Sequence, residues 1–365
     1  MLVSALAWTI LLLSGTGIKA SPQNQFSITE KYNKLIRPPK LGEKFQIWAS
    51  VNLRNIIGLS QSDQMISIEV SINLFWYDTR IIVNKDLLHG VDAHGSYLTI
   101  TSMEDRDNLW TPDLFIDKVR KMRGPDKVKY SQAPISLRLY KDNLVRYSSR
   151  MNMDLGCKMQ FGYFPFDNQT CSIRILSYSM DAKDLQLEWL GEEESYFGDK
   201  NTKLPDFEYT VELHKDPLEY SYFDKITRQS ISVRIVLKRD WDQFVVFYYI
   251  PTIVFFFFGW SLNFILRHHP KSMLKIIFTL IVIKVGMMRE IPEVNYLTFF
   301  NVWSQFCIMP IFFMIWQWVT AKAFINMDMK HQAEVMEKVA MFIVPVIYAA
   351  CMVAYWILVL SKESS

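Results

Sequence analysis

The first two thirds of the chain alternate apolar and polar residues with a period of two. Two runs, 45–53 and 66–74, show this most clearly, because every second side chain in each is apolar. This alternation is typical of antiparallel strands with one face in a core and the other in solvent. Similar runs recur at 95–102, 135–150, 171–178, 185–190, 207–213 and 230–239. The pattern predicts an antiparallel β-sandwich domain over residues 21–240, with a short amphipathic helix at 25–37 before its first strand.

The pattern changes after Arg239, where long apolar runs replace the alternation. Runs at 244–266, 296–321 and 339–361 contain no charged residue, and each is long enough to cross a bilayer. A fourth and less apolar run covers 272–288 and includes Lys284. We therefore expect a four-helix transmembrane bundle over residues 241–361, following the single β domain.

The charged residues that flank these runs predict the orientation of the chain. Residues 1–20 have a short apolar centre and a small residue, Ala20, at their end, as a cleaved signal peptide does. Lysines and arginines gather at 267–271 and 322–338, which predicts that both segments are cytoplasmic. The segment 322–338 is then a short cytoplasmic loop. We therefore expect the N-terminal domain to be extracellular, in a multi-pass protein of the plasma membrane.

Composition excludes several classes of function. The net charge of +3 is too small to indicate a nucleic-acid partner. None of the six histidines falls in a catalytic or metal-binding motif, so we expect no enzyme activity, no cofactor and no metal. Cys157 and Cys171 have neither redox nor zinc spacing, and in a secreted domain they predict a structural disulfide. Cys307 and Cys351 lie in apolar runs and are expected to be unpaired packing residues.

The predicted disulfide encloses thirteen residues with Phe164-Pro165-Phe166-Asp167 at their centre. This C-x13-C loop with an F-P-F-D core resembles the signature loop of the Cys-loop pentameric ligand-gated ion channels. Other segments extend the resemblance over most of the chain, and the segment at 177–189 is similar to the anion-channel (glycine, GABA and glutamate-gated) branch. These segments are W-x-D-x-R at 76–80, W-x-P-D at 110–113, the run 177–189, and Pro251 in the first span.

The resemblance implies a pentamer in the lipid bilayer, made of this subunit and four others, either identical or different. It implies that the loop tip, formed by Phe164, Pro165, Phe166 and Asp167, touches the connection between the second and third spans, which contains Pro292. Arg239, twelve residues before Pro251, would pair with Asp167 or a nearby acid at this junction. The adjacent Asn168-Gln-Thr170 is also a possible glycan acceptor.

A small transmitter-like ligand would, by the same resemblance, bind between subunits. The positions that match the family's aromatic face are Phe115, Tyr178, Tyr220, Tyr222 and Phe223. On the facing surface Arg150 would grip a ligand carboxylate. Two positions there depart from the family pattern, because Ser71 replaces an aromatic residue and Asn73 a second arginine. The chain could therefore bind an unusual ligand or no ligand at all. Phe115 and Tyr178 could also be ordinary core residues.

The second span would line the pore. It contains no acidic residue between Arg267 and Arg289, which argues against the cation-selective glutamate ring of the family. One helical face carries the residues Lys271, Lys275, Phe278, Val282 and Val285. If this face lines the pore, its lysines favour anions and its apolar centre can gate by dewetting. Two alternatives stay open. The lysines could snorkel to the interface, or a shifted register could turn Ser272, Ile276, Thr279 and Ile283 inward.

These observations together predict an extracellular ligand-gated ion channel of the neurotransmitter type. A ligand between β domains would shift a closed–open equilibrium of the pore. The alternative is a non-conducting ligand-binding or accessory subunit of a heteromeric receptor.

Overall fold

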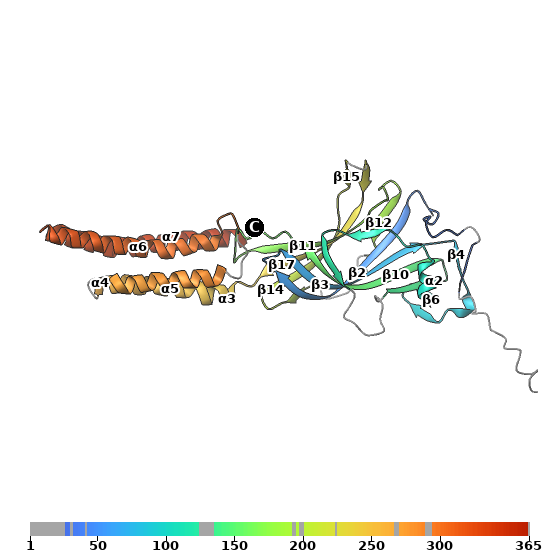
Figure 1. Cartoon of the computed structure of the whole chain (residues 1–365), viewed down its shortest axis with the longest axis horizontal. Helices are drawn as coiled ribbons and strands as arrows, with labels where there is room; N and C mark the ends of the chain where they lie inside the picture. The colour runs from blue at the N-terminus through green and yellow to red at the C-terminus, as the bar shows by residue number, and fades with distance from the viewer. Residues whose placement is uncertain are drawn as a thin grey trace, which may run out of the picture.

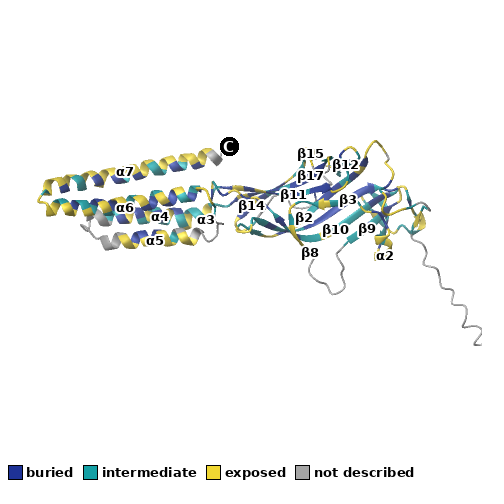
Figure 2. Ribbon diagram, turned by 45° about the horizontal axis from the view of Figure 1, so that its top comes forward, coloured by how far each residue is buried: buried dark blue, intermediate teal, exposed yellow. Residues whose placement is uncertain are grey.

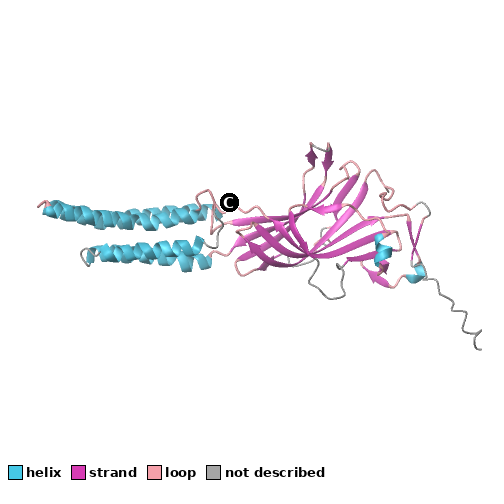
Figure 3. Cartoon of the chain, in the orientation of Figure 1, coloured by secondary structure: helices cyan, strands magenta, loops and turns pink. Residues whose placement is uncertain are grey.

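The protein divides into a strand-rich half and a helical half that lie end to end (Figures 1 and 3). The computed structural model describes residues 26–29, 32–40, 42–123, 135–191, 195–196, 201–222, 225–265, 270–288 and 294–363. The predicted signal peptide at 1–20 lies outside this part of the chain.

The elements follow one another in two blocks, strands first and helices last. Two short helices interrupt the strands, and the π-helical turn η2 precedes α4. The strands are β1 (Phe26–Ile28), β2 (Phe45–Ser60), β3 (Met65–Tyr77), β4 (Ile81–Val83), β5 (Gly90–Asp92), β6 (Gly95–Ile100), β7 (Leu114–Ile116), β8 (Val119–Arg123), β9 (Ile135–Tyr140), β10 (Leu144–Gly156), β11 (Asn168–Ser177), β12 (Leu185–Trp189), β13 (Asn201–Lys203), β14 (Phe207–Lys215), β15 (Glu219–Ser221), β16 (Ile226–Arg228) and β17 (Ser230–Arg239). The helices are η1 (Lys85–Leu87), α2 (Met103–Asp107), α3 (Asp242–Phe244), η2 (Val245–Tyr249), α4 (Ile250–Ile265), α5 (Pro270–Met288), α6 (Phe299–Asn326) and α7 (Lys330–Glu363).

Two sheets pack face to face and confirm the predicted sandwich. The larger sheet has eight strands in the order β12-β2-β3-β10-β9-β6-β5, with β8 also paired to β10. The smaller has five strands in the order β13-β14-β17-β11-β7. The alternating side chains predicted to face inward do so. In β3, for example, Ile66, Ile68 and Val70 are fully buried in the core that both sheets share.

The amphipathic helix predicted at 25–37 is wrong. Phe26–Ile28 instead form β1, which pairs antiparallel with β4 so that Ser27 lies opposite Ile82. A turn at 34–36 then leads toward β2. The reason is tertiary, because a partner strand more than fifty residues away in the chain satisfies the backbone of this short segment.

The four predicted spans are helical, but the loop predicted at 322–338 is mostly wrong. Helix α6 runs on to Asn326 and α7 already begins at Lys330, so only Met327–Met329 connect them. Asp328 adopts a positive φ of 61° in this turn. The charged residues at 330–338 form the polar first turns of α7, and Ala333 among them is buried against the rest of the chain.

The helices expose much of their apolar surface in the isolated chain (Figure 2). Among the described residues, three helical stretches are long and apolar enough to cross a membrane: Asp242–Ser261, Phe299–Asn326 and Lys330–Ser361. Only 22–39% of an apolar 18-residue segment in each of them is buried within the chain. Large side chains such as Phe312, Trp316 and Leu358 are at least half exposed. Surface of this kind requires lipid or further subunits to cover it. In α5 the apolar stretch is shorter, Leu274–Ile283.

Candidate functional site

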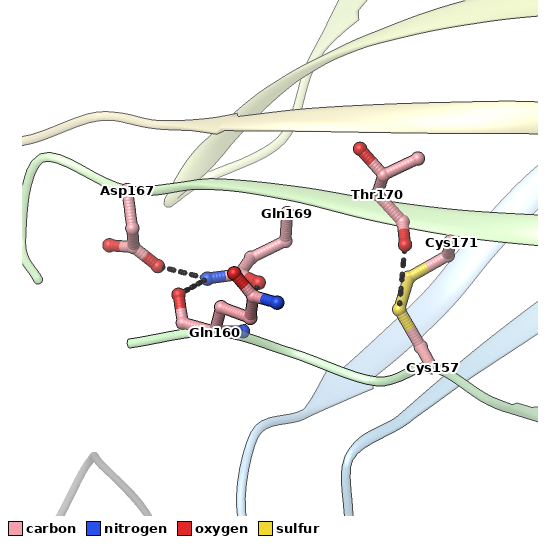
Figure 4. Close-up of a disulfide and its surroundings, with 6 residues drawn as sticks. All are labelled: Cys157, Gln160, Asp167, Gln169, Thr170 and Cys171. Carbon is pink, nitrogen blue, oxygen red and sulfur yellow. Dashed lines mark hydrogen bonds between the residues drawn. A yellow bond between two sulfur atoms is a disulfide. The ribbon is translucent and has the colours of Figure 1, made fainter. Parts of the chain in front are cut away.

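The predicted disulfide between Cys157 and Cys171 is present and ties the two sheets together. Cys157 follows the last residue of β10 in the larger sheet, and Cys171 lies within β11 in the smaller one. Both side chains are buried in the shared core. The thirteen residues between them (the Cys loop) lie at the end of the sandwich that faces the helices (Figure 4 shows the disulfide). Cys307 and Cys351 carry free thiols, as predicted.

Asp167 of the Cys loop forms a buried ion pair with Arg239, the last residue of β17. The Arg239 Nε lies 2.7 Å from one carboxylate oxygen and its Nη2 lies 3.1 Å from the other, while both side chains are only 2% exposed. The guanidinium also lies over the rings of Phe164 and Phe207, at 4.7 and 4.6 Å from their centroids. Its Nη2 donates to Gln61 in the β2–β3 turn. Arg239 therefore joins the Cys loop to three other segments at the base of the β domain.

Gln169, a residue that the sequence did not single out, holds the Cys loop in shape (Figure 4). Its amide pairs with both backbone groups of Gln160, at 2.9 and 2.8 Å, and donates a further hydrogen bond to Asp167. Gln169 is buried, whereas its neighbours Asn168 and Thr170 are exposed, as strand alternation requires. The predicted glycan acceptor Asn168 therefore faces outward, and glycosylation stays a prediction.

The Cys loop caps the N-terminus of α6. The first N–H groups of a helix have no partner within it. Here the N–H of Phe299 donates to the carbonyl of Gly162 at 2.9 Å, and that of Phe300 donates to the carbonyl of Phe164 at 3.1 Å. The side chain of Thr298 accepts from the third N–H, that of Asn301. The β domain thus completes the hydrogen bonding of a membrane helix.

Phe166 extends from the loop tip into an aromatic cluster at the top of the helices. Its ring centroid lies 5.6 Å from Trp241, 5.9 Å from Tyr249 and 5.9 Å from Trp356. These partners come from the segment before α3, from η2 and from α7. Phe166 therefore contacts both the first and the last membrane helix. Pro292, the predicted contact, lies outside the described residues, whereas Val294 two residues later packs against the β-domain core.

The aromatic residues predicted for a ligand face are exposed rather than in the core. Phe115 on β7 is 38% exposed and Tyr178, just after β11, is 71% exposed, with ring centroids 6.0 Å apart. The loop that holds Tyr178 is fixed by Asp113, which accepts hydrogen bonds from Ser177 and Ser179. The W-x-P-D motif therefore positions this loop.

A second exposed aromatic pair lies on the β15–β16 hairpin. The rings of Tyr220 and Tyr222 meet edge to face at 5.1 Å. Phe223 lies outside the described residues. In the part of the chain that the structure describes, neither a hydrogen bond nor a ring contact joins this pair to Phe115 and Tyr178.

The surface predicted to face the neighbouring subunit already holds an ion pair. Arg150 on β10 donates through both Nε and Nη2 to Glu69 on β3, and it lies opposite Ser71 in the strand register. Ser71 in turn accepts from Arg54 at 2.8 Å. Asn73 donates to Ser50 and accepts from Arg146. The two unusual positions are therefore filled by polar contacts within the chain.

A charged cluster continues along the same face around Asp92. Its carboxylate accepts from Tyr140 at 2.6 Å and from Arg138 at 3.0 Å. Burial acts to raise the pKa of Asp92, but these hydrogen bonds and one from the His94 backbone lower it overall. Burial, together with the hydrogen bond to Asp92, raises the pKa of Tyr140 to about 12.

Helix α5 exposes the predicted pore face. Lys275, Phe278, Val282 and Val285 are exposed, whereas Ile276, Ile277 and Leu280 are buried against the other helices. The side chain of Lys271 lies outside the described residues. The shifted register would require the buried Ile276 to point into the pore.

Comparison with known proteins gives a family that agrees with this geometry. Residues 24–241 match the family described as "Neurotransmitter-gated ion-channel ligand binding domain". Over 299 residues the chain is 24% identical to the gamma-aminobutyric acid receptor subunit beta of Lymnaea stagnalis, covering 78% of this chain and 57% of that protein. Over 330 residues it is 20% identical to subunit rho-2 of Homo sapiens, covering 89% and 68%.

The chain spans little more than half the length of several of these relatives. The shares are 57% for the Lymnaea stagnalis subunit and 51% for the gamma-aminobutyric acid receptor subunit pi of Bos taurus. The matched residues cover the β-sandwich and the Cys loop, and the apolar helices follow them in the chain. The chain therefore belongs to the Cys-loop family of neurotransmitter-gated ion channels, with relatives among the γ-aminobutyric acid receptor subunits, and it is not an enzyme.

Proposed function

We propose that this chain is one subunit of a plasma-membrane pentamer in which a small extracellular ligand opens a central pore that prefers anions. Our proposal that the ligand gates the pore rests on one observation, the capping of the N-terminus of α6 by the Cys loop. A movement of the loop would change the hydrogen bonding of Phe299 and Phe300, and hence the position of a pore-domain helix.

The preference for anions rests on the exposed face of α5. This face lies opposite Ile276, Ile277 and Leu280, which pack within the chain's own bundle. In a ring of five subunits, the side turned away from each bundle is the one that can meet the axis. The described lysine on that face is Lys275, and a ring of lysines attracts anions and repels cations.

Expression of the full chain in oocytes tests the proposal. We expect a ligand-evoked current whose reversal potential follows the chloride gradient when external chloride is replaced by gluconate. Lys275→Glu should move the reversal potential toward that of sodium, while Lys330→Glu, at the exposed start of α7, should leave it unchanged. A wild-type reversal potential that follows sodium would refute the anion pore.

A non-conducting accessory subunit is a second candidate, favoured by the Arg150–Glu69 ion pair where a ligand carboxylate would bind. Such a subunit would reach the cell surface alone and pass no current under any ligand. It would change the current of a conducting relative when the two are expressed together.

A further inference from the structure

A pocket of about 360 Å³ opens in the β domain beside α2. This short helix lies at the end of the domain that points away from the membrane helices (Figures 1 and 2). Residues of α2 and of the segment that follows it line one side of the pocket, while residues of β9 and β10 line the other. The pocket shares no lining residue with the exposed aromatic pairs, so it is a separate cavity.

The floor of this pocket is aliphatic. Leu109 and Leu137 are 5% and 1% exposed and belong to the core that the two sheets share. Met103 and Ile135 extend the apolar lining toward the surface. A lining of this kind suits the hydrocarbon part of a small ligand, because burying that part removes apolar surface from water.

Two polar side chains, Arg106 and Tyr147, are half-buried in the wall of the pocket. The Nη1 of Arg106 donates to the carbonyl of Ile135 at 2.9 Å, which fixes the guanidinium in place. A guanidinium has five N–H donors, and Arg106 makes no other hydrogen bond or ion pair with a described residue. Burial raises the pKa of Tyr147, and the charge of Arg106 acts to lower it, so the guanidinium lies close to this hydroxyl.

The charge of the pocket is positive where Arg106 meets Tyr147. Asp107 also lines the pocket, but it is exposed and does not act on the Tyr147 hydroxyl. Lys34 lies beside it, with its Nζ 3.2 Å from the Asp107 carbonyl. The other acids of α2, Glu104 and Asp105, do not line the pocket. A ligand group that reaches Arg106 and Tyr147 therefore meets donors and a positive charge.

We propose that this pocket binds a small carboxylate with a short aliphatic chain. The carboxylate accepts hydrogen bonds from Arg106 and Tyr147, and the chain packs on Leu109 and Leu137. Hydrogen bonds between a guanidinium and a carboxylate are charge-assisted and stronger than those between neutral groups. This site goes beyond the proposed function, because it lies within one subunit and binds its ligand whether or not a transmitter occupies the Phe115–Tyr178 face.

Three probes test this on the purified full-length protein, with binding followed by saturation-transfer NMR. Butyrate carries both the charge and the chain, acetate lacks most of the chain, and butyramide lacks the charge. Wild type should bind butyrate about tenfold more tightly than acetate, because two methylene groups are buried. It should bind butyramide more weakly than butyrate by about tenfold or more, because the amide has no charge to meet Arg106.

Variants of the two polar residues locate the carboxylate. Arg106→Gln should weaken butyrate binding by about tenfold or more and leave butyramide binding unchanged. Tyr147→Phe keeps the ring and should weaken butyrate binding roughly threefold, since one hydrogen bond is lost. Arg120→Gln is the matched control, because Arg120 also donates to a backbone carbonyl, that of Asp63 at 2.8 Å, and does not line the pocket. It should change neither affinity.

Other outcomes overturn the proposal. Butyrate binding that survives Arg106→Gln but is lost in Tyr178→Ala would place the carboxylate at the aromatic face instead of in this pocket. Equal affinities of wild type for butyrate and butyramide would refute recognition of the charge. The absence of saturable butyrate binding to wild type would refute the site, and it would leave the oocyte test of the proposed function unaffected.

Discussion

Asp167→Asn gives the sharpest test of how the base of the β domain is held together. The variant keeps the shape of the side chain but leaves the charge of Arg239, 2% exposed, without its carboxylate. Removing one partner of a buried ion pair costs about 3–5 kcal/mol. Arg239 keeps Gln61 and the rings of Phe164 and Phe207, so we expect the lower end, about 3 kcal/mol. In a domain of this size that corresponds to a fall of roughly 6–12 °C in the unfolding midpoint.

The assay is the fraction of purified full-length protein that survives heating, measured by size-exclusion chromatography. The double variant Asp167→Asn/Arg239→Met removes both charges and should cost at least ~1 kcal/mol less than the sum of the two single variants. Lys215→Gln is the matched control, because it breaks an exposed pair with Glu188 and should cost under about 1 kcal/mol. If Asp167→Asn loses no more than Lys215→Gln, or if the single effects simply add, the pair does not have the role assigned to it.

Three further changes test neighbouring features. Replacing Cys157 and Cys171 together by serine opens a loop of about fifteen residues and should cost about 3 kcal/mol of stability, so an unchanged midpoint in the same heating assay would contradict the disulfide's role. Phe166→Leu removes three ring contacts of about 0.5–1.5 kcal/mol each and should lower maximal ligand-evoked current while ligand affinity stays within about twofold; an equal loss of affinity would argue against a coupling role. Asp92→Asn should destabilise the protein at neutral pH. The folded-state pKa of Asp92 is lowered, so the stability that its carboxylate contributes is present above the unfolded pKa of about 3.9 and is lost as pH falls through the lower folded pKa. The difference in unfolding midpoint between wild type and Asp92→Asn should therefore shrink at low pH. A difference that stays constant from pH 7 to pH 3 would contradict the role of Asp92.

The long strands could be predicted because their alternation is local. In β3, the burial of Ile66, Ile68 and Val70 alternates with less buried neighbours as the sequence predicts, whereas the polar Ser71 and Asn73 further along are buried as well. Strand β1 could not be predicted, since three residues have no period and their partner, β4, is distant in the chain. The start of α7 was predicted too late in the chain. Polar residues such as those at 330–338 are as common on an exposed stretch of helix as in a loop, so their charge does not distinguish the two.

The contrast between local sequence patterns and contacts of distant residues also explains which site residues could be predicted. The disulfide and the Asp167–Arg239 pair were predicted from spacing and resemblance. The Glu69 partner of Arg150 was not, because it depends on the register that places Arg150 opposite Ser71 and therefore diagonal to Glu69. The hydrogen bond from Arg228 on β16 to the carbonyl of Tyr178 was missed for a similar reason, since it joins residues fifty positions apart.

The contact between Phe166 and Trp356 has a consequence for the order of synthesis. Trp356 lies near the end of α7, almost two hundred residues after the loop tip that it touches. The β domain can acquire its disulfide while the ribosome is still translating the helices, but the Phe166 ring gains its last partner only when α7 has entered the membrane. We expect chains stopped before α7 to keep a folded outer domain with an open junction that limited proteolysis detects. The joint between the two halves would therefore close only after α7 has been made.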